Sequence, residues 1–290
     1  MSRYFPPAPE SWNDRNPPPS NAQLLKLLGI FGLILALIIW SGLTLVNHLV
    51  WLIPPQVEQQ LGAIARPIYE RQAEPSPTQD TLNQLLDRLE QHLPPEQHPR
   101  DYQVLYIPKD TVNALAIPGD RIIIFRGLLA EVTSENELMM VLGHELGHFV
   151  NRDHLRGIVW RLVLPVAIAT LFGDASGLVG AGATVAETLS GTQFSQRQEL
   201  QADQVGLSLL QDTYGHVGGA TDFFVRLSQS QTVNIDFLST HPLPQKRIQA
   251  LERIIDQQRF PTEPPMPLAP SLQATKAFTM RMVYSRGRKL

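Results

Sequence analysis

Two histidines one helical turn apart, with an acid beside the first, are the side chains in this chain best suited to do chemistry. His144, Glu145 and His148 form an H-E-x-x-H pattern. Residues four positions apart lie on the same face of a helix, so both imidazoles can bind one Zn²⁺ at about 2.0–2.1 Å. Glu145 is then placed to take a proton from the attacking water rather than to bind the metal. The pattern therefore predicts a helix that holds one catalytic zinc ion per chain.

A catalytic zinc needs a third protein ligand, and the residues leave two candidates open. His154 follows His148 by six residues, the spacing of the H-E-x-x-H-x-x-G-x-x-H pattern, with Asn151 at the glycine position. That pattern also needs a methionine turn, and the downstream methionines lie in proline-rich or basic segments. Glu199 and Asp203 are spaced i, i+4 on a second predicted helix, which suits one ligand and one carboxylate that orients a ligating imidazole.

The absence of cysteine restricts the chemistry further. None occurs in the 290 residues, so disulfides and thiolate zinc sites are excluded, and a metal must bind histidine and carboxylate. The chain carries 24 Lys and Arg against 27 Asp and Glu, a formal charge of −3. Nucleic-acid-binding proteins show a basic excess or a basic stripe, so we expect no nucleic-acid partner.

The elements that position these residues follow from capping and apolar periodicity. Ser134 and Glu137 form a capping-box pattern at the start of the motif helix. Leucines spaced i, i+3, i+4, i+7 predict an amphipathic helix over 82–93. Alternation and turn residues predict strands at Tyr102–Ile107 and Arg121–Phe125, and further helices at about 196–212, 217–230 and 243–258. The prediction is an α+β fold, mainly helical, with a small β-sheet.

A long apolar run near the N-terminus predicts one transmembrane helix. Leu27 to Ile53 are 27 residues without a formal charge, and about 20 suffice to cross a bilayer. A cleaved signal peptide has a shorter apolar region with a small-residue cleavage site close behind it, which is missing here. Lys26 abuts the run, which favours a single-pass protein with its N-terminus inside and the bulk of the chain extracytoplasmic.

Proline-rich segments predict the domain boundaries. The expected layout is a disordered tail (1–22), an anchor (23–53) that contacts the lipid bilayer through 27–53, a linker (54–77), a zinc-binding domain (78–260) and a proline-rich, basic tail (261–290). Within the domain, residues 158–189 are apolar, but their longest charge-free stretch is too short to span a membrane. We interpret them as a helical flap near the metal.

Four ordered blocks carry a resemblance to a known family. They are Asn113-Ala114-Leu115-Ala116-Ile117-Pro118-Gly119 with Arg126-Gly127-Leu128-Leu129, then His144 to His148, then Glu199-x-x-Ala202-Asp203, and finally Ser239-Thr240-His241-Pro242 with Arg247. In these blocks the chain resembles the HtpX-like and CAAX prenyl protease family of membrane-associated zinc metallopeptidases, which are gluzincins. With a single anchor it is most similar to the Oma-type and BepA-type members.

The resemblance implies roles for individual residues. His144, His148 and Glu199 would bind zinc, and Glu145 would act as general base and acid. Asp203 and Arg247 would support the ligands, and His241 would act near the site on the oxyanion. The resemblance also implies that His154 does not bind the metal. Residues implied in substrate binding are Asn113, Ala114, Ala116, Pro118 and Gly119. The chain departs from the family's pattern at Gln196, where many members have arginine, and at Asp120, where they have glycine.

Together these features predict a membrane-anchored zinc endopeptidase of membrane or envelope protein quality control, with polypeptide substrates. A peptide is expected to pair its backbone with the strand Arg121–Phe125. The alternative is a non-catalytic anchored scaffold or chaperone-like protein that retains a structural zinc. A fourth protein ligand would mark that alternative, and His241 could supply it. The sequence carries no signal for a particular oligomeric state.

Overall fold

The computed structural model describes residues 19–97, 100–159, 193–229, 236–242 and 245–276. The chain divides into two compact units, residues 1–47 and 48–290. Most of the predicted N-terminal tail, nearly all of the predicted flap and the basic part of the C-terminal tail lie outside the described residues.

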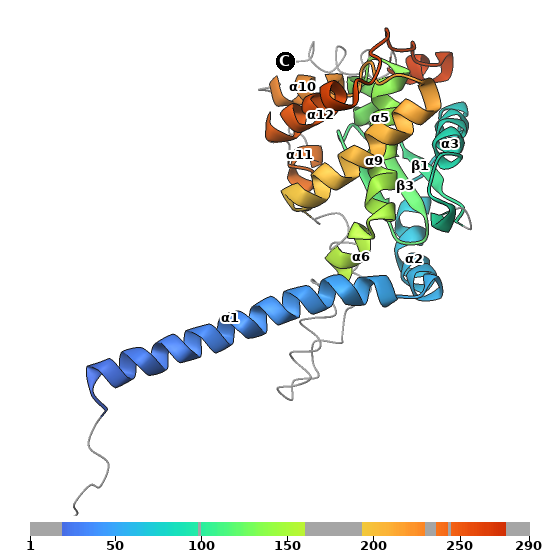
Figure 1. Cartoon of the computed structure of the whole chain (residues 1–290). Coiled ribbons are helices and arrows are strands. Elements are labelled where there is room, and N and C mark those ends of the chain that lie inside the picture. Colours follow the sequence, from blue (N-terminus) through green and yellow to red (C-terminus); the bar gives the residue numbers. More distant parts are fainter. Residues whose placement is uncertain (1–18, 98–99, 160–192, 230–235, 243–244, 277–290) are drawn as a thin grey trace, which may run out of the picture. The chain divides into compact units, whose positions relative to one another are not determined.

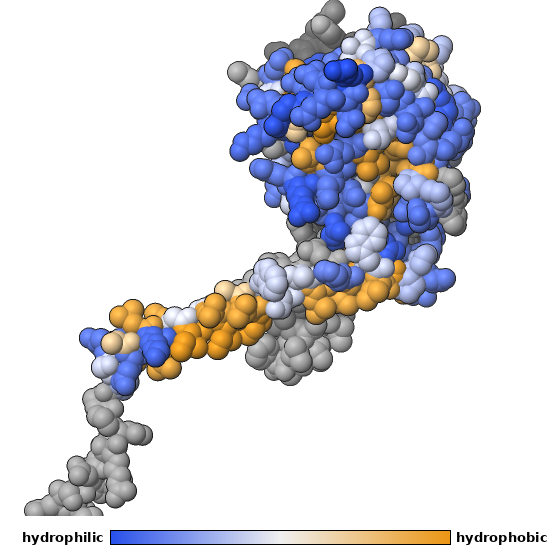
Figure 2. Space-filling view, viewed as in Figure 1, coloured by the Kyte–Doolittle hydropathy of each residue, from blue (hydrophilic) through white to orange (hydrophobic). Residues whose placement is uncertain are grey.

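The predicted N-terminal apolar helix is confirmed as α1 (Asn21–Leu52). Within it, Asn21–Gly42 is long and apolar enough to cross a membrane, and no other helix among the described residues is. Leucines and isoleucines along it, such as Leu28, Ile38 and Leu52, are exposed, and Figure 2 shows a surface that is orange along most of this helix. Such a surface is unfavourable in water, which is why it indicates a membrane span.

Three short strands form one sheet in the order β1-β3-β2. The strands are β1 (Gln103–Ile107), β2 (Ala114–Ile117) and β3 (Arg121–Phe125), so both predicted strands are confirmed. β3 pairs with β1 in parallel and with β2 antiparallel. The expectation that a peptide pairs with Arg121–Phe125 was therefore wrong. β3 is central and its backbone groups are used on both sides. The outer N–H groups of Val104 and Tyr106 on β1 donate to side chains of α3, so among the described residues β2 is the strand whose outer edge is not paired.

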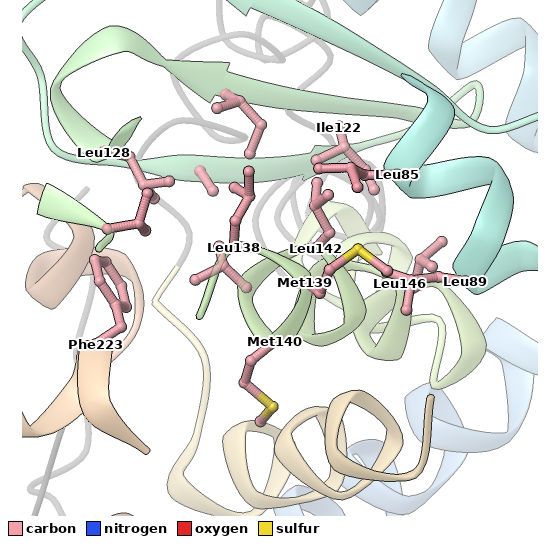
Figure 3. Packing of buried hydrophobic residues seen from close by; sticks show 14 of the residues in the cluster. Leu85, Leu89, Ile122, Leu128, Leu138, Met139, Met140, Leu142, Leu146 and Phe223 are labelled. Carbon is pink, nitrogen blue, oxygen red and sulfur yellow. The ribbon is translucent and has the colours of Figure 1, made fainter. Parts of the chain in front are cut away.

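The sheet is buried on both faces, as its uninterrupted apolar strands require. Alternate residues such as Val104, Ile122 and Ile124 face α3 (Pro77–Glu90) and α5 (Glu135–Val150). Figure 3 shows leucines of α3 and α5 gathered beneath Ile122, whereas Met140 projects from the opposite side of α5. The intervening strand residues form a second cluster with the side chains of α2 (Pro55–Glu70).

Helix α2 occupies most of the segment that was predicted to be a linker. Its inward face consists of Glu58, Gly62, Ala65 and Tyr69, all buried. A side chain at Gly62 would meet the Cα of Gly119 at 2.5 Å, so glycine is needed for α2 to approach the β2–β3 turn. α2 is thus a layer of the folded domain.

Close packing of α5 against α9 (Gln196–Tyr214) brings the two predicted metal-binding helices together (Figure 1). A Cβ atom at Gly147 would lie 2.7 Å from the Cα of Ala202, and one at Gly143 would lie 2.9 Å from the Cα of Gly206. Small residues on both helices therefore let the backbones approach more closely than ordinary side chains permit.

The remaining described elements complete the domain. They are η1 (Pro95–Gln97), α4 (Arg126–Glu131), α6 (Asp153–Ile158), α10 (Asp222–Gln229), α11 (Asp236–Thr240) and α12 (Gln245–Gln258). Folded structure continues past the predicted boundary at residue 260, because Leu268 and Leu272 are buried in the main core. The predicted mainly helical α+β class is confirmed.

Candidate metal centre

The helix that carries the H-E-x-x-H pattern begins where its cap predicts. The Ser134 hydroxyl accepts a hydrogen bond from the Glu137 N–H at 3.2 Å. The Glu137 carboxylate accepts a hydrogen bond from the Thr133 N–H at 2.9 Å. In a capping box this second bond comes from the N–H of the cap residue itself, so here it is made one residue earlier in the chain. The bond to Ser134 satisfies one of the amide groups that the first turn of a helix leaves unpaired.

Three predicted ligands converge with the spacing of a zinc site. The Nε2 atoms of His144 and His148 are 3.1 Å apart. Glu199 oxygens lie 3.6 Å from the His144 Nε2 atom and 3.4 Å from the His148 Nε2 atom. Ligands about 2.0–2.1 Å from a tetrahedral zinc are separated by about 3.3 Å, so these three donors fit the ion. All three residues are fully buried.

The ring of His241 lies at the same point. Its Nδ1 atom is 3.2 Å from both the His144 Nε2 atom and a Glu199 oxygen. His144, His148, Glu199 and His241 form a group whose ligand atoms all lie within 4.8 Å of one another. The arrangement therefore offers four protein ligands, one more than a catalytic zinc needs.

Glu145 lies beside this group with its carboxylate unused. The residue is fully buried, and neither carboxylate oxygen has a hydrogen-bond partner among the described residues. One of its oxygens lies 3.6 Å from the His241 Nε2 atom. An unpaired buried carboxylate is unfavourable in a fold, which indicates a group kept for another molecule, such as a water.

Asp203 and Arg247 contact His144 and Glu199 on the side away from the proposed metal position. The Asp203 carboxylate is 2.8 Å from the Nδ1 atom of His144, which leaves the Nε2 atom of that ring facing the metal position. Arg247 donates two hydrogen bonds to Asp203, at 2.6 and 2.7 Å, and a third to Glu199. Burial raises the pKa of the Asp203 carboxyl, but Arg247 and His144 outweigh burial and lower it.

Asp153 lies against the ring of His148 as Asp203 lies against the ring of His144, although it was not among the residues predicted from the sequence. Its carboxylate is buried and lies 3.0 Å from the His148 Nδ1 atom. Burial lowers the pKa of His148, but Asp153 and Glu199 raise it to about 10. Phe194 stacks on the ring of His148 at 3.9 Å. Neither residue lies in a recognisable motif, although the Asn-Arg-Asp turn directly after the helix was a usable signal.

His154, the other candidate for the third ligand, is directed away from the metal position. Its Nε2 atom lies 2.7 Å from a carboxylate oxygen of Glu58, on α2. Glu58 also accepts hydrogen bonds from Arg100. Burial raises the pKa of Glu58, but His154 and Arg100 lower it to about 2. His154 thus belongs to a buried ion network, and of the two candidates only Glu199 lies with His144 and His148.

The residues implied in substrate binding are divided between the two ends of β2. Asn113 lies at the end near the metal group, where its side-chain oxygen accepts from the Thr240 hydroxyl at 3.4 Å, one residue before His241. Gly119 lies at the other end, in a left-handed conformation (φ 84°) against Gly62. Pro118 and Gly119 have a visible structural role as a turn that α2 packs against.

Comparison with known proteins agrees with the motifs. Residues 77–255 match the sequence profile described as "Peptidase family M48". The chain is 32% identical over 152 residues to the mitochondrial metalloendopeptidase OMA1 of Arabidopsis thaliana (52% of this chain, 31% of that protein). It is 29% identical over 155 residues to the beta-barrel assembly-enhancing protease of Yersinia pestis (49% and 32%). It thus spans about a third of these two relatives. The mitochondrial metalloendopeptidase OMA1 of Schizosaccharomyces pombe is 24% identical over 291 residues, covering 87% of this chain and 81% of that protein.

Proposed function

Because the chain belongs to peptidase family M48, we propose that it is a zinc-dependent endopeptidase whose zinc is bound by His144, His148 and Glu199. The observation that carries this proposal is the set of 3.1–3.6 Å separations among the three donors, beside a buried, unpartnered Glu145 carboxylate. A base without a partner beside a metal position is the arrangement that hydrolysis requires.

In this mechanism each residue has one task. Zinc, when bound, lowers the pKa of water and polarises the scissile carbonyl. Glu145 takes a proton from the attacking water and returns it to the leaving amine. Asp203 and Asp153 keep the two imidazoles in the tautomer and orientation that present Nε2 to the metal position. Arg247 balances the negative charge of Glu199 and Asp203 in a buried site.

The free edge of β2 is the proposed binding place for the peptide backbone. The Phe125 N–H donates to the Asn113 carbonyl, and residues opposite one another in an antiparallel pair are alternately hydrogen-bonded. Asn113, Leu115 and Ile117 therefore face β3, whereas Ala114 and Ala116 direct their backbone groups outward. Since the Ala114 N–H is engaged by the Asn113 side chain, Ala116 is the main pairing position. Addition of an extended peptide to such an edge needs no particular side chain.

We further propose that α1 anchors this activity to a membrane, with the domain on the extracytoplasmic side. Support comes from the apolar, exposed surface of α1 and from Lys26, which directly precedes its uncharged run. One relative is named for enhancing beta-barrel assembly, which fits a protease that acts on membrane proteins. The proposed role is therefore quality control of membrane or envelope proteins.

Replacing the base while keeping the metal tests the proposal. Glu145→Gln should retain one zinc per chain and lose hydrolysis of an unfolded protein such as casein, because glutamine cannot accept the proton. Glu252→Gln, at an exposed position on α12, is the control and should retain both properties. Full activity in the Glu145 variant would contradict the mechanism.

The position of His241 favours a second candidate, a scaffold with a structural zinc. Four protein ligands close a tetrahedral site and leave no position for water. Zinc content and casein cleavage, measured on the same purified protein, separate the two. One zinc per chain without cleavage, in wild type and Glu145→Gln alike, would support the scaffold.

A further inference from the structure

Helix α2 carries a second apolar surface besides the one it buries against the sheet. Val57, Ile64 and Ile68 are spaced i, i+7 and i+11, so they form one stripe along the helix, whereas Leu61 beside them packs against the buried cluster. Val57, Ile64 and Ile68 are 41%, 48% and 36% exposed. Three large aliphatic side chains on one helix in water are an unfavourable surface unless something covers them.

The stripe cannot turn inward, because the neighbouring face of α2 is already fixed to the domain. Glu58 is fully buried and is held by Arg100 and His154. Gly62 touches the backbone of Gly119, which leaves no room for rotation of the helix. The exposed side chains are thus a fixed surface of the folded domain.

The chain leaves the proposed anchor within a few residues of this stripe. α1 ends at Leu52 and α2 begins at Pro55, a separation of at most about 10 Å along an extended chain. Trp51 and Leu52 are 56% and 74% exposed. Arg152 donates hydrogen bonds to the carbonyls of Val50, at 2.7 Å, and Ile53, at 2.9 Å, so the end of α1 is tied to the same folded unit as α2.

We propose that α2 lies on the bilayer surface, with Val57, Ile64 and Ile68 inserted at the boundary between headgroups and acyl chains. An amphipathic helix with a polar opposite face binds membranes in this way. The occupant of the stripe is lipid because the anchor delivers this helix to the interface, and exposed Trp51 is a residue type enriched there. The inference rests on the proposed anchoring by α1.

Such docking would orient the catalytic domain on the membrane. α2 covers one face of the sheet whose β2 edge is the proposed peptide site, and Glu58 of α2 contacts His154, six residues after the ligand His148. The two contacts make α2 a rigid connection between the bilayer surface and the site.

The absence of cysteine makes the experiment direct, because each introduced cysteine is a unique labelling site. An environment-sensitive fluorophore is attached at Ile64→Cys or Ile68→Cys in the full chain, reconstituted in vesicles of phosphatidylcholine and phosphatidylglycerol in equal parts. Ala63→Cys is the matched control, since it is exposed and lies about 100° around the same helix. Leu35→Cys, within α1, reports on the anchor itself.

We expect the labels at Ile64 and Ile68 to emit at shorter wavelength than the label at Ala63, and to lose emission with lipid spin-labelled near the top of the acyl chain. If the labels at Ile64 and Ile68 are as exposed to water as the label at Ala63 while the label at Leu35 is quenched, the proposal is overturned and the anchor is left intact. If the labels at Ile64 and Ile68 emit at shorter wavelength but are not quenched by the lipid, the proposal is overturned, and a second copy of the chain covers the stripe instead. An unquenched Leu35 label would overturn the anchor and this inference together.

Discussion

Asp153→Asn tests whether the carboxylate behind His148 tunes the metal site. Asp153 is fully buried, lies 3.0 Å from the His148 Nδ1 atom, and accepts hydrogen bonds from Arg156 at 2.7 Å and Gln198 at 2.9 Å. Asparagine keeps the shape but removes the negative charge. It can also present its amide N–H₂ group, instead of an acceptor, to the imidazole.

The expected size of the effect follows from this geometry. Loss of a carboxylate that orients a ligating histidine costs about 10–100-fold in metal affinity. That corresponds to about 1.4–2.7 kcal/mol of binding free energy. We expect the upper part of this range, because Asp153 is fully buried, so no solvent replaces the lost charge.

Zinc affinity is measured by competition with a chelating dye on the full chain in detergent. Asp212→Asn, an exposed acid on α9, makes the same change of charge and should leave the affinity unchanged. Thermal unfolding of the metal-free proteins separates loss of fold from loss of affinity. An Asp153→Asn affinity within twofold of wild type, in a folded protein, would refute a positioning role for this carboxylate.

Three further changes have defined outcomes. His241→Ala should retain one zinc per chain, because three ligands remain; loss of zinc in metal analysis would show that the fourth ligand is required. Gly147→Ala should destabilise the fold by about 1–3 kcal/mol and lower zinc content, since its Cβ would lie 2.7 Å from Ala202. Gly29→Ala, with nothing within 4 Å, is its control in thermal unfolding, and equal melting temperatures would contradict the close-packing argument. Burial and neighbouring acids raise the pKa of Glu90 from 4.5 to about 7. The folded state therefore binds this proton more tightly than the unfolded state does, and the contribution of Glu90 to stability falls as pH rises between these two values. After allowance for solvent screening, the Glu90→Gln protein should therefore be about 1 kcal/mol more stable than wild type near pH 8 and no more stable near pH 4. Urea unfolding at both pH values measures this difference. A difference that does not change with pH would contradict the prediction.

Local patterns predicted the elements that carry the chemistry. Ser134 and Glu137 marked the start of the motif helix to the residue, because capping involves only neighbours in the chain. Apolar periodicity located the helix α3 and the strands β1 and β3 to within a few residues. Each of these signals is short-range, so it can be read without knowledge of the fold.

Strand order and layer assignment were not predictable in the same way. β3 proved to be the central strand, which moved the proposed peptide edge to β2. The segment after the anchor proved to be helix α2, which covers one face of the sheet. Pairing partners and buried faces depend on residues far apart in sequence, and no local pattern records them.

By itself, the sequence determined the kind of metal site: without cysteine, and with two histidines one turn apart on a capped helix, only a histidine and carboxylate site was possible. The tertiary structure decided which of the two candidate third ligands lies beside these histidines. Glycines on α5 and α9 let the helices approach until Glu199 reached the imidazoles, whereas His154 was drawn to Glu58 on α2. It also added Asp153 and brought His241 into the group. The physical reason is that a metal site is defined by distances of a few ångströms between donors, and those distances come from helix packing.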